Sequence, residues 1–181
     1  MPPLVSLVNQ ILSSLTVLAQ AIIIGLLVVF LINKNKTFLD FVGKYAVLLS
    51  FIVALTATLG SLFYSEIAGF EPCKLCWFQR IFMYPQVILL GLALWKKDQN
   101  IINYILGLSL PGAIIAGYHY LLQLGVVPPL ACSTIGYSVS CSQRFVMSFD
   151  YITIPLMAFS AFLLLILLQL IKKGYNKQND F

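Results

Sequence analysis

Residues 151–171 have the sequence YITIPLMAFSAFLLLILLQLI, which contains no charged residue. About 20 mostly apolar residues are enough for a helix to cross the hydrocarbon core of a bilayer, so this run predicts a transmembrane helix. Four further apolar runs precede it, at about residues 15–32, 45–64, 77–95 and 101–122. The sequence therefore predicts an all-α polytopic membrane protein with five spans.

The overall composition supports the same class of protein. Of the 181 residues, 60% are hydrophobic and only 9% are charged, and the mean hydropathy is +0.95. Soluble domains contain about 25% charged residues, and a compact domain of this size cannot bury so much apolar surface. The net charge of +5 does not indicate nucleic acid as a partner, because the basic residues lie in short runs between the apolar stretches. We expect the apolar stretches to contact membrane lipid, and we expect no nucleic acid as a partner.

The basic residues are distributed unevenly between the two sides that five spans would create. Eight of the eleven fall on one side: Lys34, Lys36, Lys44, Lys96, Lys97, Lys172, Lys173 and Lys177. Loops rich in Lys and Arg stay in the cytoplasm, so we expect a multi-pass protein of the cell inner (cytoplasmic) membrane. Its N-terminus and the segments at about 65–76 and 123–150 are expected outside, and its C-terminus is expected in the cytoplasm.

An amphipathic stretch precedes the first span. Apolar residues recur there at helical spacing, with polar residues on the other side. The pattern leaves two alternatives open: the stretch lies on the membrane surface, or it lengthens the first helix.

All four cysteines fall in the two segments expected outside. Cys73 and Cys76 are in the first of these segments, and Cys132 and Cys141 are in the second. The outer compartment is oxidising, so two disulfides can form there.

The first cysteine pair belongs to the sequence EPCKLCWFQR, at residues 71–80. Proline suits the first position of a helix, so we expect Pro72 there and the CxxC in the first helical turn. Cysteines three residues apart share a helix face, and the helix N-terminus favours a thiolate. These features predict a redox-active pair.

Two further polar residues lie inside predicted spans. Arg80 follows Cys76 by four residues, on the same stripe and about 6 Å deeper along the helix. A charge at that depth usually faces a cavity or a partner, although it can also extend to the lipid headgroups. His119, the only histidine, is expected at a similar depth in the fourth span. Both are candidates for binding an electron acceptor.

The second pair, Cys132 and Cys141, encloses a polar loop that contains glycine. Such a loop suits a disulfide that another protein attacks, and the alternative is a structural staple. After it, Phe145, Phe149 and Ile152 recur at helical spacing and predict a stretch that rests on the membrane surface.

Electrons that pass through two cysteine pairs need an acceptor. The sequence has no haem, flavin or nucleotide motif, and a zinc site of four thiolates is uncommon on an oxidising side. We therefore expect no metal, haem or flavin. A quinone, either ubiquinone or menaquinone, fits a thiol pair at the lipid boundary, because its carbonyl oxygens accept hydrogen bonds.

The chain resembles the DsbB/BdbC-type disulfide bond formation proteins over about residues 45–171. The resemblance is carried by PCKLCWFQR at 72–80, YH at 118–119, PPLAC at 128–132, CSQR at 141–144 and IP at 154–155. It implies a four-helix transmembrane bundle over residues 41–172. Residues 1–40 would add the amphipathic stretch and one extra N-terminal transmembrane helix, and residues 173–181 would form a cytoplasmic tail.

The resemblance also implies an activity. A protein of this family is a protein-disulfide oxidoreductase that reoxidises a thioredoxin-fold thiol oxidase of the DsbA/BdbD type and passes the electrons to quinone. Cys132 would form the mixed disulfide with that partner, and Cys141 would exchange with Cys73. Cys76 would face the quinone, with Arg80 and His119 nearby. The short spacing of the second pair leaves the order of attack on Cys132 and Cys141 open.

Two other functions remain as alternatives. Proteins similar to the vitamin K epoxide reductases also join cysteine pairs to quinone-like substrates, but their loop cysteines precede the CxxC, whereas here the CxxC comes first. A membrane scaffold with two structural disulfides would need neither Arg80 nor His119.

Overall fold

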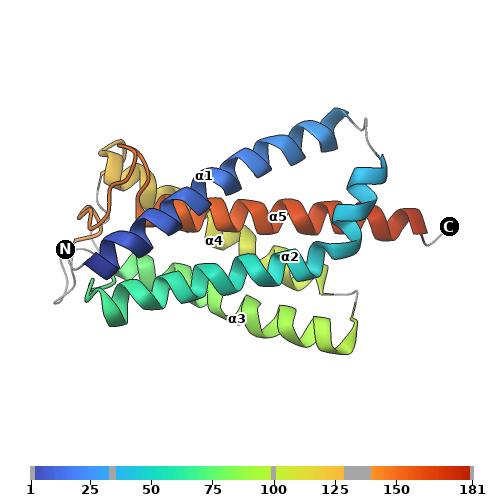
Figure 1. The fold of residues 1–181 in the computed structure, drawn as a ribbon, viewed down its shortest axis with the longest axis horizontal. Coiled ribbons are helices and arrows are strands. Elements are labelled where there is room, and N and C mark those ends of the chain that lie inside the picture. The colour runs from blue at the N-terminus through green and yellow to red at the C-terminus, as the bar shows by residue number, and fades with distance from the viewer. Residues whose placement is uncertain (1–2, 33–35, 99–100, 129–139, 180–181) are drawn as a thin grey trace.

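The computed structural model describes residues 3–32, 36–98, 101–128 and 140–179. They form five long helices, shown in Figure 1: α1 (Pro3–Ile32), α2 (Lys36–Leu62), α3 (Lys74–Lys96), α4 (Ile102–Leu124) and α5 (Ile154–Asn179). A π-helical turn, η1 (Phe63–Ile67), extends α2. All five helices are long and apolar enough to cross a membrane, and the described residues contain no strand beyond an isolated bridge. The predicted all-α fold with five spans is confirmed.

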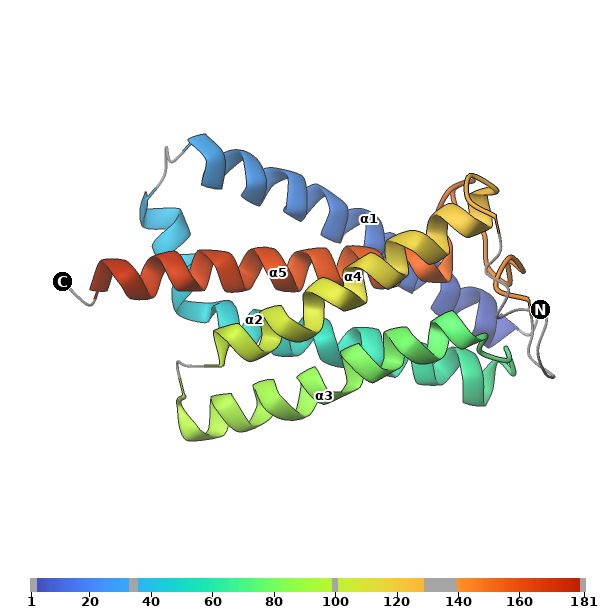
Figure 2. The ribbon, with the colours of Figure 1, turned by 180° about the vertical axis from the view of Figure 1, so that it is seen from behind.

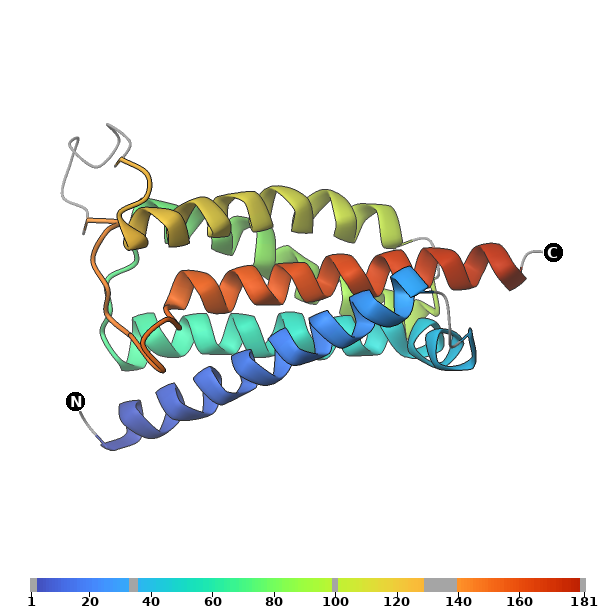
Figure 3. The same ribbon diagram turned by 90° about the horizontal axis from the view of Figure 1, so that it is seen from above.

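Helix α5 is the centre of the bundle. It packs extensively against α1, α2 and α4, while α3 packs against α2 and α4. In its most apolar stretch 61% of the residues are buried, against 17% in α1. Helix α1 crosses the outside of the bundle obliquely (Figure 3), and α3 and α4 lie on the opposite face (Figure 2). The architecture is a four-helix bundle with one additional helix packed on its side.

Close helix contacts depend on glycine at two positions. A Cβ atom on Gly112 of α4 would lie 2.4 Å from a ring carbon of Phe162, which is fully buried on α5. A Cβ on Gly43 of α2 would lie 2.6 Å from the Cβ of Tyr175. Small residues allow helix backbones to approach closely in membranes, where packing rather than the hydrophobic effect holds helices together.

Two buried hydrogen bonds join helices inside the bundle. Ser109 on α4 donates to Gln86 Oε1 on α3 at 3.0 Å. Gln169 Nε2 on α5 donates to the hydroxyl of Ser50 on α2 at 2.8 Å. Interhelical bonds of this kind contribute on average about 0.6 kcal/mol each, and their directionality fixes the rotation of the helices that they join.

The N-terminal stretch continues the first span. Helix α1 runs without a break from Pro3 to Ile32, so the alternative in which the stretch lengthens the first helix is confirmed. The reason is that α1 has partners along the bundle. Tyr64 donates to Asn9 Oδ1 at 3.0 Å, and Gln20 Nε2 donates to Ser160 Oγ of α5 at 3.3 Å.

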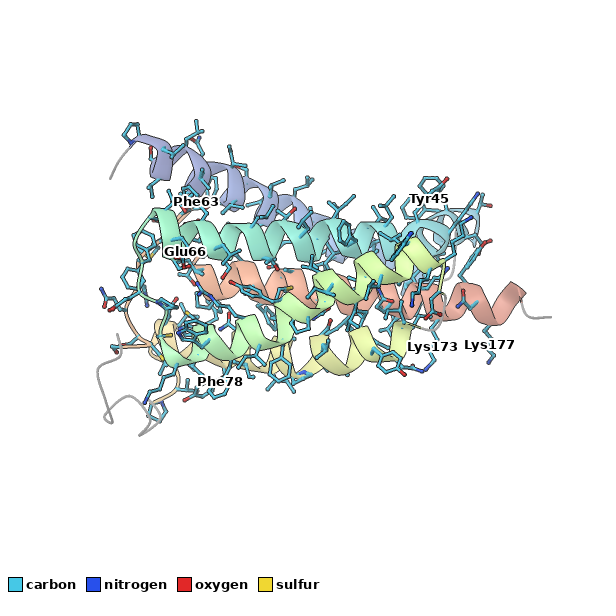
Figure 4. The ribbon with its side chains drawn as sticks, turned by 90° about the horizontal axis from the view of Figure 1, so that it is seen from below. Tyr45, Phe63, Glu66, Phe78, Lys173 and Lys177 are labelled. Carbon is cyan, nitrogen blue, oxygen red and sulfur yellow. The ribbon has the colours of Figure 1, made fainter. Side chains whose placement is uncertain are left out.

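The two ends of the bundle differ in chemistry. Cys73 and Cys76 lie at the end that carries Phe63, Glu66 and Phe78, and Lys173 and Lys177 lie at the other end (Figure 4). Residues 140–153 cover the first end, next to the C-terminal end of α4. The charge asymmetry of the sequence therefore corresponds to two opposite ends of the molecule.

Residues 140–153 contain no helix, so the helical spacing of the apolar residues after the second cysteine pair does not correspond to a helix, and their contact with the membrane surface stays a prediction. Ser148 and Ile152 form an antiparallel bridge, and Phe149 and Asp150 between them have φ values of 52° and 63°. Asp adopts this left-handed conformation more readily than most residues. Ile152 is fully buried while Phe149 is exposed, so the apolar spacing reflects a tight turn that buries one side chain.

Candidate functional site

The CxxC lies at the beginning of α3, but the helix begins later than expected. Cys73 is the N-cap, with extended backbone (φ −69°, ψ 171°), and Lys74 is the first helical residue. Pro72 therefore lies before the cap and not at the first helical position. Cys76 is still in the first turn, and the Cys73 thiol donates a hydrogen bond to the Cys76 sulfur at 3.4 Å. The pair is in the dithiol form.

His119 lies directly against Cys73. It is 1% exposed, and its Nε2 atom is 3.7 Å from Cys73 Sγ and 3.0 Å from the carbonyl oxygen of Cys141. Its other ring nitrogen, Nδ1, is 2.9 Å from Gln79 Nε2. An amide nitrogen only donates, so Nδ1 accepts from Gln79 and the proton of the neutral ring is on Nε2. Gln79 thereby directs the imidazole N–H toward the two cysteines.

Cys141 completes this cluster. The ligand atoms of Cys73, His119 and Cys141 all lie within 4.8 Å of one another. One cysteine of the second pair is therefore close to the first pair, although more than about 60 residues separate them in the chain. Non-local packing brings these residues together. The other cysteine, Cys132, lies outside the described residues.

Among the described residues, the two thiols outside the membrane-spanning segments, those of Cys73 and Cys141, have raised pKa values. The hydrogen bond to Cys76 raises the pKa of Cys73 to about 12, and burial adds to this shift while His119 opposes it. Burial raises the pKa of Cys141 to about 11, although backbone N–H groups at the start of α3 lower it. In this dithiol state both groups are protonated at neutral pH, so exchange between them requires that a proton be removed.

The segment that carries Cys141 is fastened to the end of α4. The Nε atom of Arg144 donates to the backbone oxygen of Gln123 at 2.8 Å, and its Nη2 atom contacts the same oxygen. Gln123 Nε2 in turn donates to the backbone oxygen of Gln143 at 3.0 Å. A cation at a helix C-terminus also interacts favourably with the helix dipole. These contacts hold Cys141 near Cys73.

Arg80 is bound to the end of α2. Its Nε donates to Ser61 Oγ at 3.0 Å, its Nη2 donates to the Ser61 backbone oxygen at 3.2 Å, and its guanidinium lies 5.2 Å from the centre of the Trp77 ring. The Arg80 side chain is thus held in place by protein groups near the C-terminal end of α2.

Cys76 and Arg80 both line an apolar cavity of about 320 Å³ between α1, α2, α3 and α5. Gln79 also borders this cavity, and Glu71 lies in its lining. His119 instead lines a separate small cavity of about 20 Å³, together with Cys73 and Cys76. The sequence placed Arg80 and His119 together beside one acceptor. The structure separates them, with Cys76 at the border of both cavities.

The sequence analysis assigned no role to Gln79, Ser61 or Gln123. Gln79 had a detectable signal, because a glutamine three residues after Cys76 shares its helix face inside an apolar span. Ser61 and Gln123 had none, since each acts through contacts with residues distant in sequence.

The cluster of Cys73, His119 and Cys141 consists of ligand types that zinc prefers. The four-thiolate zinc site, which the sequence left as an alternative, would also need Cys132, which lies outside the described residues. The absence of a metal stays a prediction.

Comparison with known proteins places the chain in a family. A family model described as disulfide bond formation protein DsbB matches residues 43–171. Disulfide bond formation protein C of Bacillus subtilis (strain 168) is 42% identical over 134 residues, which cover 71% of this chain and 93% of that protein. The SPbeta prophage-derived disulfide bond formation protein B of the same strain is 46% identical over 136 residues, 74% of this chain and 90% of that protein.

Relatives also occur outside that genus. A probable disulfide formation protein C of Halalkalibacterium halodurans is 42% identical over 122 residues, which cover 67% of this chain and 88% of that protein. No solved structure matches the chain significantly. The family match includes α3, α4 and the cysteine cluster that joins them, so this chain belongs to the DsbB family of disulfide bond formation proteins.

Proposed function

We propose that this protein reoxidises an extracytoplasmic thioredoxin-fold thiol oxidase and passes the electrons through two cysteine pairs to a membrane quinone, either ubiquinone or menaquinone. The observation that carries the proposal is the position of the CxxC. Cys73 lies in the cluster with Cys141, while Cys76 lines the apolar cavity beside Arg80. The first pair therefore lies beside the Cys141 thiol on one side and beside an apolar cavity on the other, which supports transfer between a second cysteine pair and a lipid-soluble acceptor.

The exchange begins at the second pair. A thiolate of the reduced partner attacks Cys132 of the Cys132–Cys141 disulfide, which forms a mixed disulfide and releases the Cys141 thiolate. The second partner thiol attacks the mixed disulfide, so that the oxidised partner leaves and Cys132 becomes a thiol. Two electrons and two protons have then moved from the partner to the second pair.

Transfer to the first pair follows the same chemistry. The Cys141 thiolate attacks Cys73 of the Cys73–Cys76 disulfide and releases the Cys76 thiolate, and Cys132 then attacks Cys141 and releases Cys73. Oxidation of the Cys73–Cys76 dithiol supplies the two electrons and two protons that convert quinone to quinol. Arg80 is suited to donate a hydrogen bond to a carbonyl oxygen that gains charge in this step.

His119 serves the step between the pairs. Its Nε2–H group is directed at Cys73 and the Cys141 backbone by Gln79. When Cys73 leaves as a thiolate, this N–H donates a hydrogen bond to the sulfur. A stabilised leaving thiolate speeds exchange, so His119 acts on thiol transfer rather than on the quinone.

Quinone reduction by purified protein with a reduced thioredoxin-fold oxidase, followed optically, tests the whole scheme. We expect turnover with wild-type protein and none with Cys76→Ser. We also expect Cys141→Ser, mixed with the oxidised partner, to accumulate a Cys132–partner mixed disulfide on non-reducing gels, because the Cys132 thiolate attacks the partner disulfide and the Cys141 thiol that would resolve this adduct is missing. Accumulation with Cys132→Ser instead would reverse the order of attack. A wild-type protein that exchanges disulfides with the partner but reduces no quinone would contradict the acceptor assignment.

A further inference from the structure

Helix α1 lies outside the residues that the family model matches, which begin at residue 43. It nevertheless forms one wall of the 320 Å³ cavity, through Leu12, Leu15, Thr16, Leu18, Ala19 and Ile22. The cavity that contains Cys76 and Arg80 is therefore built partly by a helix outside the family match.

Contacts within and beyond this wall hold α1 on the bundle. Toward its N-terminal end, Leu12 packs against Gly60 of α2, where a Cβ would lie 3.2 Å from the leucine side chain. Further along, Gln20 accepts from Tyr151 at 3.0 Å and donates to Ser160 at 3.3 Å. Beyond that point, Ile23 and Leu26 join a buried cluster with leucines of α5. The wall therefore has a fixed position.

The space behind the wall exists because α1 packs on α5 far more than on α2. Figure 3 shows the oblique course of α1 across the bundle. Small residues on the facing helices, Ala57 on α2 and Ala158 and Ala161 on α5, line the cavity without filling it. The lining of the cavity is mostly apolar, and it includes the side chains of Arg80 and Cys76.

This arrangement suits an amphiphilic ligand with a polar ring and an apolar tail. The ring would lie beside Cys76 and Arg80, and the tail would extend between α1, α2 and α5. A volume of about 320 Å³ is near the lower end for small-molecule sites, which span roughly 300–1,000 Å³. The cavity therefore suits a ring and the first part of a tail, with the remainder of the tail in lipid.

We propose that α1 is a wall of the acceptor site, and that its face around Leu15, Thr16 and Ala19 binds the proximal isoprenoid tail of the quinone. The proposal rests on the quinone-dependent function above and adds a specificity determinant to it. Because α1 residues line the cavity along this side, contacts with them would make the affinity for quinone depend on the tail.

Two matched substitutions on α1 test this proposal. Ala19 lines the cavity, whereas Ala21 is exposed on another face of the same helix. Ala19→Trp places an indole in the tail site, and Ala21→Trp adds the same group outside it. We expect Ala19→Trp to raise the KM for a tailed quinone by about tenfold or more, the scale on which a hydrophobic pocket discriminates. Ala21→Trp should stay within about twofold of wild type.

A tail-free quinone separates tail binding from a general disturbance of the protein. We expect wild type to prefer the tailed quinone and Ala19→Trp to lose that preference, while mixed-disulfide formation with the partner is unchanged in both variants. A photoreactive quinone analogue provides a second measurement on unmodified protein, and we expect adducts within residues 12–22.

The outcomes distinguish this proposal from the one on which it rests. If wild type reduces quinone but both Trp variants keep its KM and tail preference, and adducts avoid α1, then α1 is not a wall of the site and the proposed function stands. If wild type exchanges disulfides with the partner but reduces no quinone, the acceptor assignment and the role of α1 are both wrong.

Discussion

His119 is positioned by one neighbour and acts on two others. Gln79 fixes the proton on Nε2, and that N–H faces Cys73 and the Cys141 carbonyl oxygen. A histidine that faced a quinone would affect electron acceptance, whereas the proposed function gives a histidine at this position a part in thiol exchange. The contacts of His119 therefore distinguish a role in thiol exchange from a role in quinone binding. Its depth in the membrane does not distinguish them.

We expect His119→Ala to slow transfer from the second cysteine pair to the first. Removal of one donor to a developing negative charge costs about a hundredfold or more in a preorganised site, and we expect about tenfold or more here, because the Cys76 thiol also lies within hydrogen-bond distance of Cys73. Quenched-flow trapping of the exchange intermediates measures this step. The KM for quinone should be unchanged, and a selective rise in that KM would move His119 to the acceptor site.

The raised thiol pKa values predict a pH dependence for the reduced protein. With a pKa of about 11 instead of 9.0, Cys141 has about a hundredfold less thiolate at pH 8. Its alkylation by iodoacetamide should be slower by that factor than for an ordinary thiol and should keep rising with pH beyond 9. Alkylation that levels off near pH 9 would contradict the burial of this thiol.

The same shifts predict the direction in which stability changes. A thiol whose pKa is higher in the folded state stabilises the fold fully below its unfolded pKa, and this contribution is lost as pH rises through the folded pKa. That window begins near pH 9 for both thiols, and it extends to about pH 12 for Cys73 and to about pH 11 for Cys141. The melting temperature of the reduced protein in detergent should fall above pH 9 more than that of Cys141→Ser.

Arg80→Ala should weaken quinone reduction and leave exchange with the partner nearly intact, because Arg80 lines the cavity at Cys76 and not the thiol cluster. Loss of a preorganised donor costs on the order of 3 kcal/mol, or roughly a hundredfold in rate, and we expect less at a partly hydrated site. Arg80→Lys should recover only part, since an ammonium group lacks the planar donor fork. Unchanged quinone kinetics in Arg80→Ala would reduce Arg80 to a structural tie to Ser61.

At the scale of elements, the packing of α4 on α5 sets the position of His119 relative to the CxxC. Gly112 in that interface lies so near Phe162 that an added Cβ would overlap the ring. His119 lies seven residues further along α4, roughly two turns away, so displacement of α4 at this contact also displaces the imidazole.

We expect Gly112→Ala to destabilise the protein by about 1–3 kcal/mol, because the new methyl group overlaps the Phe162 ring and the core must shift. Gly107→Ala on the same helix is the matched control, since its Cβ would meet nothing within 4 Å. That substitution should be neutral or stabilising by up to about 1 kcal/mol through helix propensity. Thermal unfolding in detergent compares the two, and equal effects would contradict the close approach of α4 and α5.

In the molecule as a whole, the reactive thiols and the basic residues lie at opposite ends. The cysteine cluster occupies one end, and Lys173 and Lys177 occupy the other (Figure 4). Loops with excess Lys and Arg remain cytoplasmic, so this division predicts which end faces outward.

Impermeant thiol reagents applied to intact reduced spheroplasts should label the cysteines of the first and second pairs without lysis, slowly at Cys73, which is buried, and at Cys141, whose pKa is raised. A cysteine introduced at Lys177 of a cysteine-free variant is the control, and it should be labelled only after lysis. The reverse pattern would mean that the molecule has the opposite orientation.

The sequence by itself determined the fold class, the five spans and the position of the CxxC near a helix N-terminus. These are local properties: hydropathy is a sum over consecutive residues, and cysteines three apart share a helix face. For the same reason the start of α3 was misplaced by two residues, since the local preference of proline does not include the extended backbone of Cys73.

Which polar residues lie together depends on the tertiary packing. His119 contacts Cys73 and Cys141 while Arg80 lies at a separate cavity, because the rotation of each helix about its axis selects the face that it presents. That rotation depends on contacts between distant residues, such as Gly112 with Phe162 and Arg144 with Gln123. The wall that α1 contributes to the cavity has the same origin, because it follows from the angle at which one apolar helix crosses another.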